Sequence, residues 1–329
     1  MNSPSVSRRV ALCGALTSLS LLACGSALAQ PDSYPSKPIT IVVGYPAGGS
    51  TDLSGRTLGA ELSRKLGVPV IIENVGGAGG AIGAQKVVNA APDGYTLLVG
   101  ASNEIAISRL VSASVKYDVK DFTPIGLIAT QPMVLVASQK SGVKTVEQFM
   151  TLAKQNPGKY SFGSSGVGTA LHLAGEMVKD QGGLFMTHIP YRGVAPLAND
   201  LLGNNIEFGV FVLSSGLPHI RSGKVVALGT TEARRSPMTP DIPALAETPK
   251  LKGIDINIWF ALMGPAGLPE PVVAKLKKAL NESLQTPALR KKLEDSGSTV
   301  SPLNVDMPKF LAQETAKYKR IVDFAKIKE

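Results

Sequence analysis

Residues 39–66 read ITIVVGYPAGGSTDLSGRTLGAELSRKL, and this stretch predicts the kind of fold. Ile39 to Val43 is a short run of mostly β-branched residues, which is typical of a buried strand. From Asp52 to Leu66, leucines at positions 58, 62 and 66 are four residues apart, so we expect a helix with one apolar face. Gly67 follows and ends the predicted helix. A strand, a glycine-rich turn and a helix in this order indicate a layered α/β fold.

Strand-like and helix-like runs alternate along the rest of the chain. Further strands are predicted at residues 70–72, 96–99, 160–164, 187–191, 206–211 and 225–229, and helices at 80–90, 146–155, 169–179, 195–202 and most of 270–326. This alternation is typical of α/β layers with mainly parallel sheets. The 329 residues exceed what one ordinary core holds, so we expect two domains.

Two segments interrupt the alternation and predict how the domains connect. Residues 123–138 form a long apolar stretch without helical period, and the chain returns through a proline-rich segment at 237–249. We therefore predict two lobes joined by two crossover segments. Residues 30–127 and 230–329 form lobe 1, and residues 128–229 form lobe 2. Two connections favour a hinge between the lobes.

The first 29 residues have the three parts of a secretory signal. Arg8 and Arg9 precede the uncharged apolar run Val10–Leu22, and Ala27-Leu28-Ala29 is an A-x-A cleavage site. We expect export, cleavage after Ala29 and a periplasmic mature protein. No later stretch of about 18 or more apolar residues predicts a membrane span.

Two variants of this signal stay open. Ser7-Arg8-Arg9 resembles the start of a twin-arginine signal, and Leu21-Leu22-Ala23-Cys24 resembles a lipobox, which would place a lipidated Cys24 at the mature N-terminus. Cleavage after Ala29 instead removes both cysteines, Cys13 and Cys24. A mature chain without cysteine has no disulfide, no thiolate metal site and no cysteine nucleophile.

Composition and charge exclude several classes of function. The formal net charge is +9, but the lysines and arginines are scattered and no basic stripe is interleaved with aromatics, so nucleic acid is not an expected partner. The 3 histidines have no metal-ligand spacing, and the sequence offers no nucleophile–base pair. We expect no cofactor, no metal and no enzymatic activity.

The turn Gly44–Asp52 is the first candidate ligand site. Its glycines allow close approach to the backbone, and Ser50 or Thr51 is expected to cap the helix that follows. Amides at a helix N-terminus, together with the positive end of the helix dipole, suit a carboxylate or a phosphate. A plain tight turn with an N-cap explains the same residues equally well.

The turn Phe162–Thr169 has the same organisation in the other lobe. It joins a predicted strand to a predicted helix, contains the hydroxyls of Ser164 and Ser165, and ends in the capping residue Thr169. A pair of such turns, one in each lobe, favours a ligand held between the lobes. His172, on the second helix, contacts either the ligand or its own protein neighbours.

A third glycine cluster, Gly76-Gly77-Ala78-Gly79-Gly80, has a different interpretation. Ile82 occupies a position where the dinucleotide pattern G-x-G-x-x-G needs glycine. We therefore expect close backbone packing here rather than a phosphate site.

Short motifs follow one another in a defined order and spacing. In the first lobe they are Tyr34-Pro35-Ser36-Lys37-Pro38-Ile39, YPAGGSTD at 45–52, Glu73-Asn74 with GAGG at 77–80, and PDGYTLL at 92–98. In the second lobe they are GVGT at 166–169 with HLAGE at 172–176, Pro190-Tyr191-Arg192-Gly193, DLLG at 200–203 and LPHI at 217–220. Through these motifs the chain resembles the Bug (TctC-type) extracytoplasmic receptors of tripartite tricarboxylate transporters, over about residues 35–325.

The resemblance implies a type II periplasmic-binding-protein fold that closes around a small carboxylate. It implies that amides and hydroxyls of the first turn hold the carboxylate: Tyr45, Ala47, Gly48, Gly49, Ser50, Thr51 and Asp52. Ser102 and Asn103 would also line the cleft. The second turn would hold the other end of the ligand, often through ordered water, with Ser164, Ser165, Gly168 and Thr169. Further candidates are His172, Tyr191, Arg192, Gly193 and Phe211.

This sequence departs from the family pattern in two places. Val75 stands where the family often has arginine, and an apolar run replaces the acidic residue that the family often has near Phe211 and Val212. An acidic side chain there would suit an ammonium group, so its absence argues against an amino-acid ligand. We hypothesise a ligand with one carboxylate and an apolar or aromatic body, with a dicarboxylate as the alternative.

Three functions compete at this stage. The first is a monomeric periplasmic receptor that delivers its ligand to the membrane subunits of a tripartite transporter. The second is a periplasmic receptor that feeds a sensor kinase, and neighbouring genes would distinguish it from the first. The third, an exported α/β hydrolase, needs a catalytic constellation that the sequence does not supply.

Overall fold

The computed structural model describes residues 34–236 and 239–327. The predicted signal at residues 1–29, with its cleavage and lipidation variants, lies outside the described residues. The described residues from Lys37 onward form one compact body. Within the described part of that body, no helix has the length and apolar character needed to cross a membrane.

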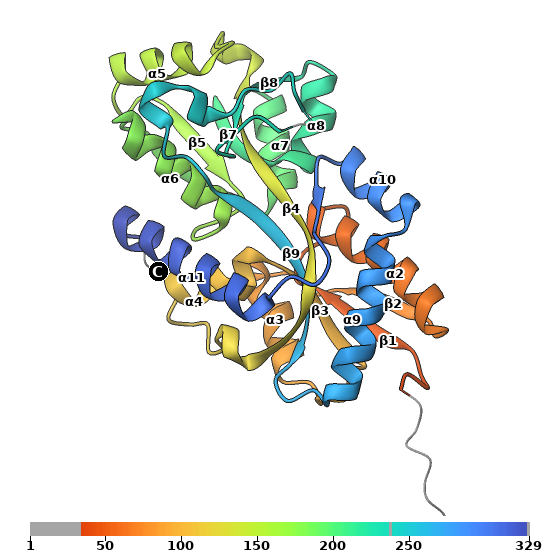
Figure 1. Cartoon of the computed structure of the whole chain (residues 1–329). Coiled ribbons are helices and arrows are strands. Elements are labelled where there is room, and N and C mark those ends of the chain that lie inside the picture. Colours follow the sequence, from red (N-terminus) through yellow and green to blue (C-terminus); the bar gives the residue numbers. More distant parts are fainter. Residues whose placement is uncertain (1–33, 237–238, 328–329) are drawn as a thin grey trace, which may run out of the picture. The chain divides into compact units, whose positions relative to one another are not determined.

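The strands of the body form one sheet in the order β2-β1-β3-β9-β4-β7-β5-β6, and β8 and β10 also pair with β4 (Figure 1). The strands are β1 (Ile39–Val43), β2 (Val70–Asn74), β3 (Thr96–Ala101), β4 (Phe122–Ser138), β5 (Ser161–Ser164), β6 (Thr187–Pro190), β7 (Phe208–Val212), β8 (Val225–Thr230), β9 (Asn257–Pro265) and β10 (Thr299–Val300). Most lie within a few residues of their predicted positions.

Two long strands connect two small parallel groups. β1 pairs in parallel with β2 and β3, and β5 pairs in parallel with β6 and β7. Between these groups, β4 and β9 run antiparallel to each other, from the pair Phe122 and Pro265 to the pair Pro132 and Asn257. The prediction of mainly parallel sheets is therefore wrong for the centre of the sheet. One connecting strand leaves the first group and the other returns to it, so the two run in opposite directions.

The partner of β4 changes at one point along the strand. It pairs with β9 up to Pro132 and with β7 from Met133 onward. We call the part of the body around β1, β2 and β3 lobe 1, and the part around β5, β6, β7 and β8 lobe 2. The predicted boundary between residues 127 and 128 falls inside a continuous strand, so the division at 30–127, 128–229 and 230–329 stays a prediction.

Helices cover the sheet. They are α2 (Ser50–Leu66), α3 (Ala81–Val88), α4 (Ser108–Val111), α5 (Val146–Gln155), α6 (Ala170–Gly182), α7 (Val194–Leu202), α8 (Leu213–Arg221), α9 (Glu270–Leu284), α10 (Pro287–Asp295) and α11 (Met307–Ala325), with the short turns η1 (Ala78–Gly80) and η2 (Asn103–Ile107). Gly67 ends α2 in the left-handed conformation, as expected. The helix α8 was not predicted, because Gly216 and Pro218 disfavour a helix interior.

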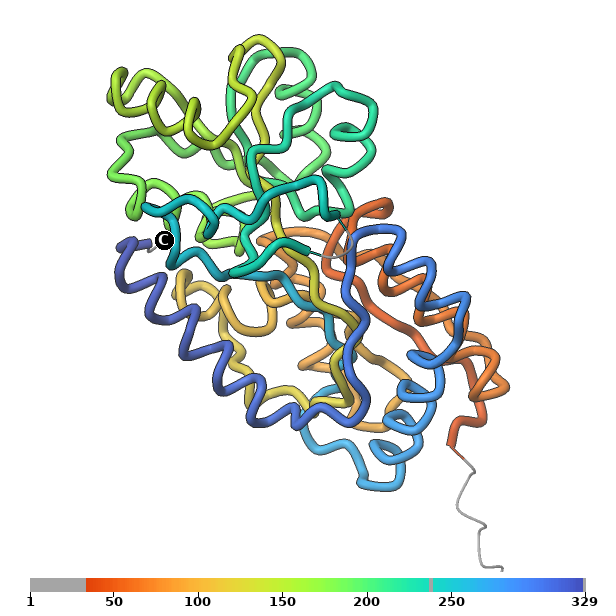
Figure 2. The backbone as a smooth tube through the Cα atoms, turned by 45° about the horizontal axis from the view of Figure 1, so that its top comes forward, coloured from red at the N-terminus to blue at the C-terminus, as the bar shows by residue number. Residues whose placement is uncertain are grey.

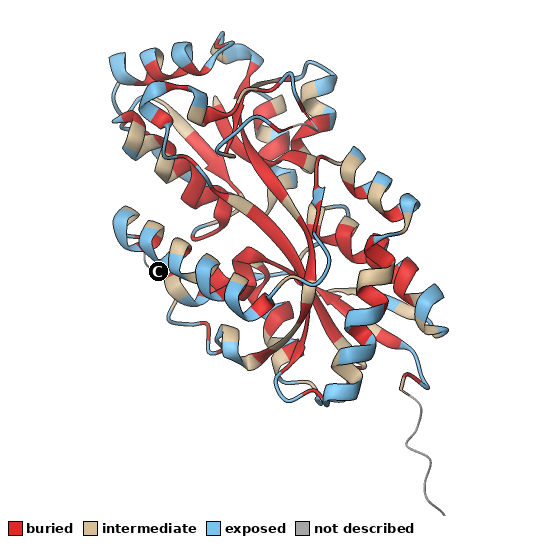
Figure 3. Cartoon of the chain, viewed as in Figure 1, coloured by how far each residue is buried: buried red, intermediate tan, exposed pale blue. Residues whose placement is uncertain are grey.

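Burial explains why these elements form, and the buried residues of Figure 3 follow the strands and the inner faces of the helices. Ile41 in β1 and Leu58 in α2 are fully buried, which confirms the strand and the helix face predicted there. In lobe 2, Leu213 and Leu217 of α8 are four residues apart and both enter the core. Burying a leucine contributes about 2 kcal/mol, so together they offset the roughly 3 kcal/mol that a proline costs in a helix.

The last helix contacts both lobes. α11, drawn in dark blue in Figure 2, packs against η2 of lobe 1 and against α6 of lobe 2. Trp259 of β9 packs edge-on against Phe310 of α11, and its indole N–H donates to Glu314 over 3.1 Å. Trp259 is 1% exposed, so it packs the return segment and is not accessible for stacking on a ligand.

Candidate ligand-binding site

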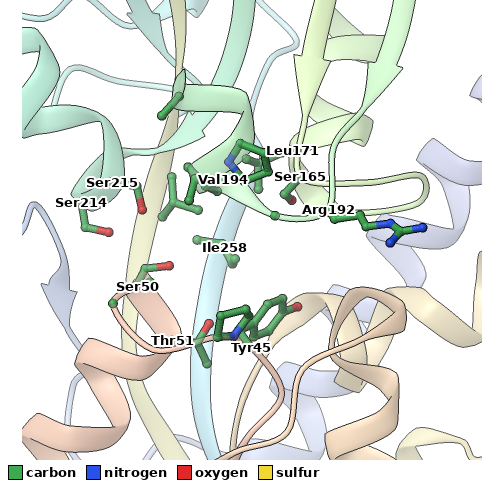
Figure 4. Close-up of a pocket in the computed structure, with 18 of the residues that line it drawn as sticks. Tyr45, Ser50, Thr51, Ser165, Leu171, Arg192, Val194, Ser214, Ser215 and Ile258 are labelled. Atoms are coloured by element: carbon green, nitrogen blue, oxygen red, sulfur yellow. The ribbon is translucent and has the colours of Figure 1, made fainter. Parts of the chain in front are cut away.

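A cavity of about 390 Å³ is lined by residues of both lobes. In Figure 4, Ser50 and Thr51 lie on one side, Ser214 and Ser215 lie on the other, and Ile258 of β9 lies between them. The predicted site residues that line this cavity are Tyr45, Ala47, Gly48, Gly49, Ser50, Thr51, Asn103, Ser165, Arg192 and Gly193. The structure therefore brings together most of the first turn with part of the second.

The N-terminus of α2 faces this cavity without a side-chain cap. Gly49 is the N-cap residue, and no side chain accepts from the first helical amides. The prediction that Ser50 or Thr51 caps the helix is wrong, because both residues already belong to its first turn. The first amides of a helix have no intrahelical acceptor. The amides of Ser50 and Thr51 therefore have no acceptor within the helix and no side-chain cap.

Asp52, in the same first turn, does not line the cavity. Its carboxylate accepts from the amide of Gly48 at 2.9 Å, from Arg56 Nε at 2.9 Å and from Asn74 Nδ2 at 2.8 Å. Burial acts to raise the pKa of Asp52, but these bonds, led by Arg56, hold it below its usual value. Asp52 is thus an ionised side chain that stabilises the turn through hydrogen bonds and does not cap the helix.

The second turn differs, because protein side chains already accept from several of its amides. Thr169 caps α6 as predicted, accepting from the amide of His172. The amide of Gly168 donates to His172 Nδ1 at 3.0 Å, and the amide of Ala170 donates to Asn103 Oδ1 at 2.7 Å. The expected pair of similar amide sites is therefore uneven: at the start of α6 side chains accept from the amides of Gly168, Ala170 and His172, whereas at the start of α2 no side chain caps the helix.

Asn103 and Tyr45 connect the two turns. Asn103 Nδ2 donates to Tyr45 Oη at 3.0 Å, while its carbonyl oxygen accepts from Ala170 at the start of α6. Tyr45 Oη in turn lies 2.7 Å from the carbonyl oxygen of Gly79 and 2.8 Å from Glu104 Oε2. One hydrogen-bonded cluster thus joins the first turn, the third glycine cluster and the second turn.

A second cavity of about 670 Å³ adjoins the first. The two cavities share the lining residues Tyr45, Pro46, Asn103, Ser165, Arg192 and Gly193. The second cavity adds three predicted residues, Gly168, Thr169 and Tyr191. It also takes in the glycine cluster Gly76–Gly80, which we had expected only to pack closely.

Five predicted residues line neither cavity: Asp52, Ser102, Ser164, His172 and Phe211. Ser102 and Phe211 are fully buried. Ser164 Oγ lies 2.7 Å from His188 Nε2, and the His188 ring stacks on His172 with centroids 3.7 Å apart. Ser164, His172 and His188 lie behind the lining, where they fix the shape of the second turn.

Sequence reasoning missed most of the lobe 2 wall. The lining residues that were not predicted are Pro46, Leu171, Val194, Ala195, Pro196, Ala198, Val212, Ser214, Ser215, Pro218, His219 and Ile258. Ser214 and Ser215 come two and three residues after the end of the buried strand β7, and Ser164 and Ser165 stand at and just after the end of β5. A serine pair close to the end of a buried strand is the shared signal that would have pointed to them.

The charge of the lining favours an anion. Among the described residues that line the two cavities, none is an aspartate or a glutamate. Arg192 also belongs to both linings, and in Figure 4 its guanidinium group points away from the centre of the first cavity. A helix N-terminus without opposing carboxylates is an environment that stabilises negative charge.

Comparison with known protein families assigns the chain to a family. The profile of the family described as "Tripartite tricarboxylate transporter family receptor" matches residues 55–327. The chain belongs to this TctC family. The resemblance found in the sequence motifs is thereby confirmed.

Individual relatives of this TctC receptor support the same family assignment. BugT of Bordetella pertussis (strain Tohama I) is 33% identical over 294 residues, which cover 88% of this chain and 90% of BugT. The solved structure "R. palustris Rpa4515 with adipate" has a TM-score of 0.85 and 30% identity, covering 90% of this chain and 99% of that one. The structure of MatC from Rhodopseudomonas palustris with bound malate has a TM-score of 0.82 and 29% identity, covering 88% and 100%. The receptor thus has the α/β periplasmic-binding-protein fold and is a solute-binding protein rather than an enzyme.

Proposed function

We propose that this receptor captures a small carboxylate in the 390 Å³ cavity, with the carboxylate group at the N-terminus of α2. The observation that carries the proposal is the uncapped first turn of a 17-residue helix, facing a cavity whose described lining has no acidic residue. The amides of Ser50 and Thr51 donate to the carboxylate, and the helix dipole adds to the attraction. The adipate and malate complexes of the two relatives support a carboxylate ligand.

The opposite wall of the cavity determines the rest of the ligand. It is mainly apolar, with Leu171, Val194, Ala195, Pro196, Val212, Pro218 and Ile258. We therefore propose a ligand with one carboxylate and an apolar or aromatic body. Ser214 and Ser215 offer hydrogen bonds to a neutral polar group at its far end. A dicarboxylate is the second candidate, because Arg192 lies at the edge shared with the second cavity.

Binding and closure are coupled in this proposal. The carboxylate contacts lobe 1 and the apolar body contacts α6, α7 and α8 of lobe 2. A ligand that touches both lobes only when they are together favours the closed arrangement by population shift. The bond from the Ala170 amide to Asn103, at 2.7 Å, is one protein contact that closure gains.

The destination of the ligand follows from the family. We propose that the mature chain works as a monomer in the periplasm and delivers its ligand to the membrane subunits of a tripartite transporter. A receptor that feeds a sensor kinase stays the alternative. A neighbouring gene for a histidine kinase, without genes for membrane transport subunits, would favour that alternative.

A thermal-shift screen tests the function directly. The mature receptor is heated with benzoate, hexanoate, adipate, malate or aspartate, and with benzamide and hexanamide as uncharged controls of matched shape. We expect benzoate or hexanoate to raise the melting temperature and both amides to leave it unchanged. A ligand at 100 times its Kd adds about 2.7 kcal/mol, which corresponds to several degrees.

Two outcomes of the screen contradict the proposal at different levels. Stabilisation by aspartate, with none by benzoate or hexanoate, contradicts the ligand class. Equal stabilisation by a carboxylate and its amide contradicts the role of the α2 amides.

A further inference from the structure

One hydroxyl group next to the cavity faces two acceptors. Tyr45 Oη lies 2.7 Å from the Gly79 carbonyl oxygen and 2.8 Å from Glu104 Oε2. A tyrosine hydroxyl has one hydrogen and donates one bond. The Gly79 carbonyl can only accept, so it needs the Tyr45 hydrogen. The bond between Tyr45 and Glu104 then requires a hydrogen on the Glu104 carboxyl.

An ionised Glu104 leaves the cluster one hydrogen short. Glu104 is 1% exposed, and its other oxygen already accepts from the amide of Ala101 at 2.7 Å. If Tyr45 donated to Glu104, two oxygens would face each other over 2.7 Å at Gly79 without a hydrogen between them. Buried polar groups in proteins are almost always paired. A protonated Glu104 gives each of these groups a partner.

The groups around Glu104 do not offset a negative charge there. Tyr117 donates to the backbone carbonyl of Glu104 at 2.7 Å, and among the described residues Tyr117 and Tyr45 are the titratable side chains that hydrogen-bond to Glu104. On the packed helices, Arg109 of α4 bonds a backbone carbonyl, and Lys317 of α11 pairs with Glu314. Burial raises the pKa of Glu104 to about 7, against the hydrogen bonds from Ala101 and Tyr45, which lower it.

The third glycine cluster belongs to the same arrangement. A Cβ atom on Gly80 would lie 2.8 Å from Glu104 Oε2 and 3.0 Å from Tyr45 Oη, and Gly80 has a φ of +98°. Only glycine fits a position that is both left-handed and this close to its neighbours. Close backbone packing, predicted for residues 76–80, is therefore found at Gly80, which packs against the carboxyl of Glu104, while the cluster also lines the second cavity.

We propose that a protonated Glu104 positions Tyr45 at the ligand turn, and that capture of an anion by this receptor takes up a proton. This inference rests on the proposed function, because it requires an anion in the cavity that Tyr45 and Asn103 line. A bound anion raises the cost of a second negative charge at Glu104. The bound state therefore holds the proton more tightly than the free state. Affinity is constant below about pH 7 and falls above it, by at most about tenfold per pH unit.

Isothermal titration calorimetry tests the linkage. Benzoate and adipate are titrated into the mature receptor from pH 6 to pH 9, at each pH in two buffers with different ionisation enthalpies. We expect uptake of a fraction of one proton near pH 7.5 and an affinity that falls several-fold from pH 7 to pH 8. Glu104→Gln keeps a neutral donor to Tyr45. In this variant we expect wild-type affinity at pH 6, no fall above pH 7 and no proton uptake.

The outcomes separate this inference from the proposed function. Binding without proton uptake, or an identical pH profile in wild type and Glu104→Gln, overturns the linkage and leaves the carboxylate receptor intact. If neither probe binds, the proposed ligand class fails, and carbon-13 NMR of the ligand-free receptor decides about Glu104. A Glu104 carboxyl that titrates near 4.5 overturns its role, whereas one that titrates near 7 and is missing in Glu104→Gln supports it.

Discussion

The turns Gly44–Asp52 and Phe162–Thr169 look alike in sequence and differ in the structure. Both follow a buried strand, both are rich in glycine and hydroxyls, and both start a helix. In the second turn Thr169 occupies the N-cap position and bonds the amide of His172. In the first turn Gly49 occupies that position and no side chain caps the helix. The residue at the N-cap, rather than the glycine content, decides which helix start has a side-chain cap.

The residues behind the two turns differ as well. Behind the first turn lies Glu104, which is fully buried beside Tyr45. Behind the second turn lie the stacked rings of His172 and His188, with His188 bonded to Ser164. One turn is supported by an acid and the other by a pair of bases. The two lobes should therefore respond to pH with opposite signs.

The largest expected effect is on how the free energy of unfolding changes with pH. Burial raises the pKa of Glu104 from 4.5 to about 7, so the folded protein binds this proton more tightly than the unfolded chain. The Glu104 contribution to the free energy of unfolding is present at low pH. It is lost as the pH rises from about 4.5 to about 7, a change on the order of 3 kcal/mol. Burial, and then the charge of His172, lower the pKa of His188 to about 3. The contribution of His188 to the free energy of unfolding is present above about pH 6.5 and is lost as the pH falls toward 3.

Urea unfolding between pH 5 and pH 8 measures the contributions of Glu104 and His188 to the free energy of unfolding. Relative to wild type, Glu104→Gln should gain more stability at pH 8 than at pH 5, and His188→Gln should gain more at pH 5 than at pH 8. Parallel stability curves for the three proteins would mean that neither group titrates as the geometry indicates.

The next effect is on affinity and separates the amide of Ser50 from its hydroxyl. Ser50 is the first helical residue, where proline is tolerated, and the preceding Gly49 has the extended backbone that a following proline needs. Ser50→Pro therefore deletes one amide hydrogen and keeps the helix. We expect carboxylate affinity to fall tenfold to about a hundredfold, about 2 kcal/mol for a bond to a charged group.

Ser50→Ala is the matched control, because it removes the hydroxyl and keeps the amide. Calorimetry with the best carboxylate of the screen compares the two variants with wild type. Equal losses in both would show that the hydroxyl, and not the amide, holds the ligand.

The smallest expected effect concerns the second turn. Thr169→Ala removes the cap of α6 and should lower the free energy of unfolding by about 1 kcal/mol, while Thr169→Ser should keep it near the wild-type value. Carboxylate affinity should change less than in Ser50→Pro, because side chains of the protein already accept from the amides of Gly168, Ala170 and His172. An affinity loss in Thr169→Ala as large as in Ser50→Pro would remove the distinction between the turns.

Local sequence patterns predicted most helices and strands, since leucine spacing in α2 and glycine at its end are local signals. The helix α8 was missed because Gly216 and Pro218 are local helix breakers. It forms because Leu213 and Leu217 enter the lobe 2 core, which is a tertiary effect. Local patterns also could not predict the antiparallel pairing of β4 with β9, because the paired residues are more than a hundred positions apart in the chain.

The candidate site was predictable only in part, for a similar reason. The first turn carries its own signal in the run from Tyr45 to Thr51, and the cavity includes it. The apolar wall is assembled from α6, α7, α8 and β9, which no local pattern brings together. Glu104 has no motif at all: its role depends on Tyr45, which lies 59 positions away in the chain.

A crystal structure of the receptor with the carboxylate that stabilises it most in the screen is the most direct test of the central claim. The account predicts both carboxylate oxygens at the start of α2, with at least one about 3 Å from the amide nitrogen of Ser50 or Thr51. A carboxylate bound instead by Arg192, or at the start of α6, with no ligand atom at the α2 amides, would contradict it.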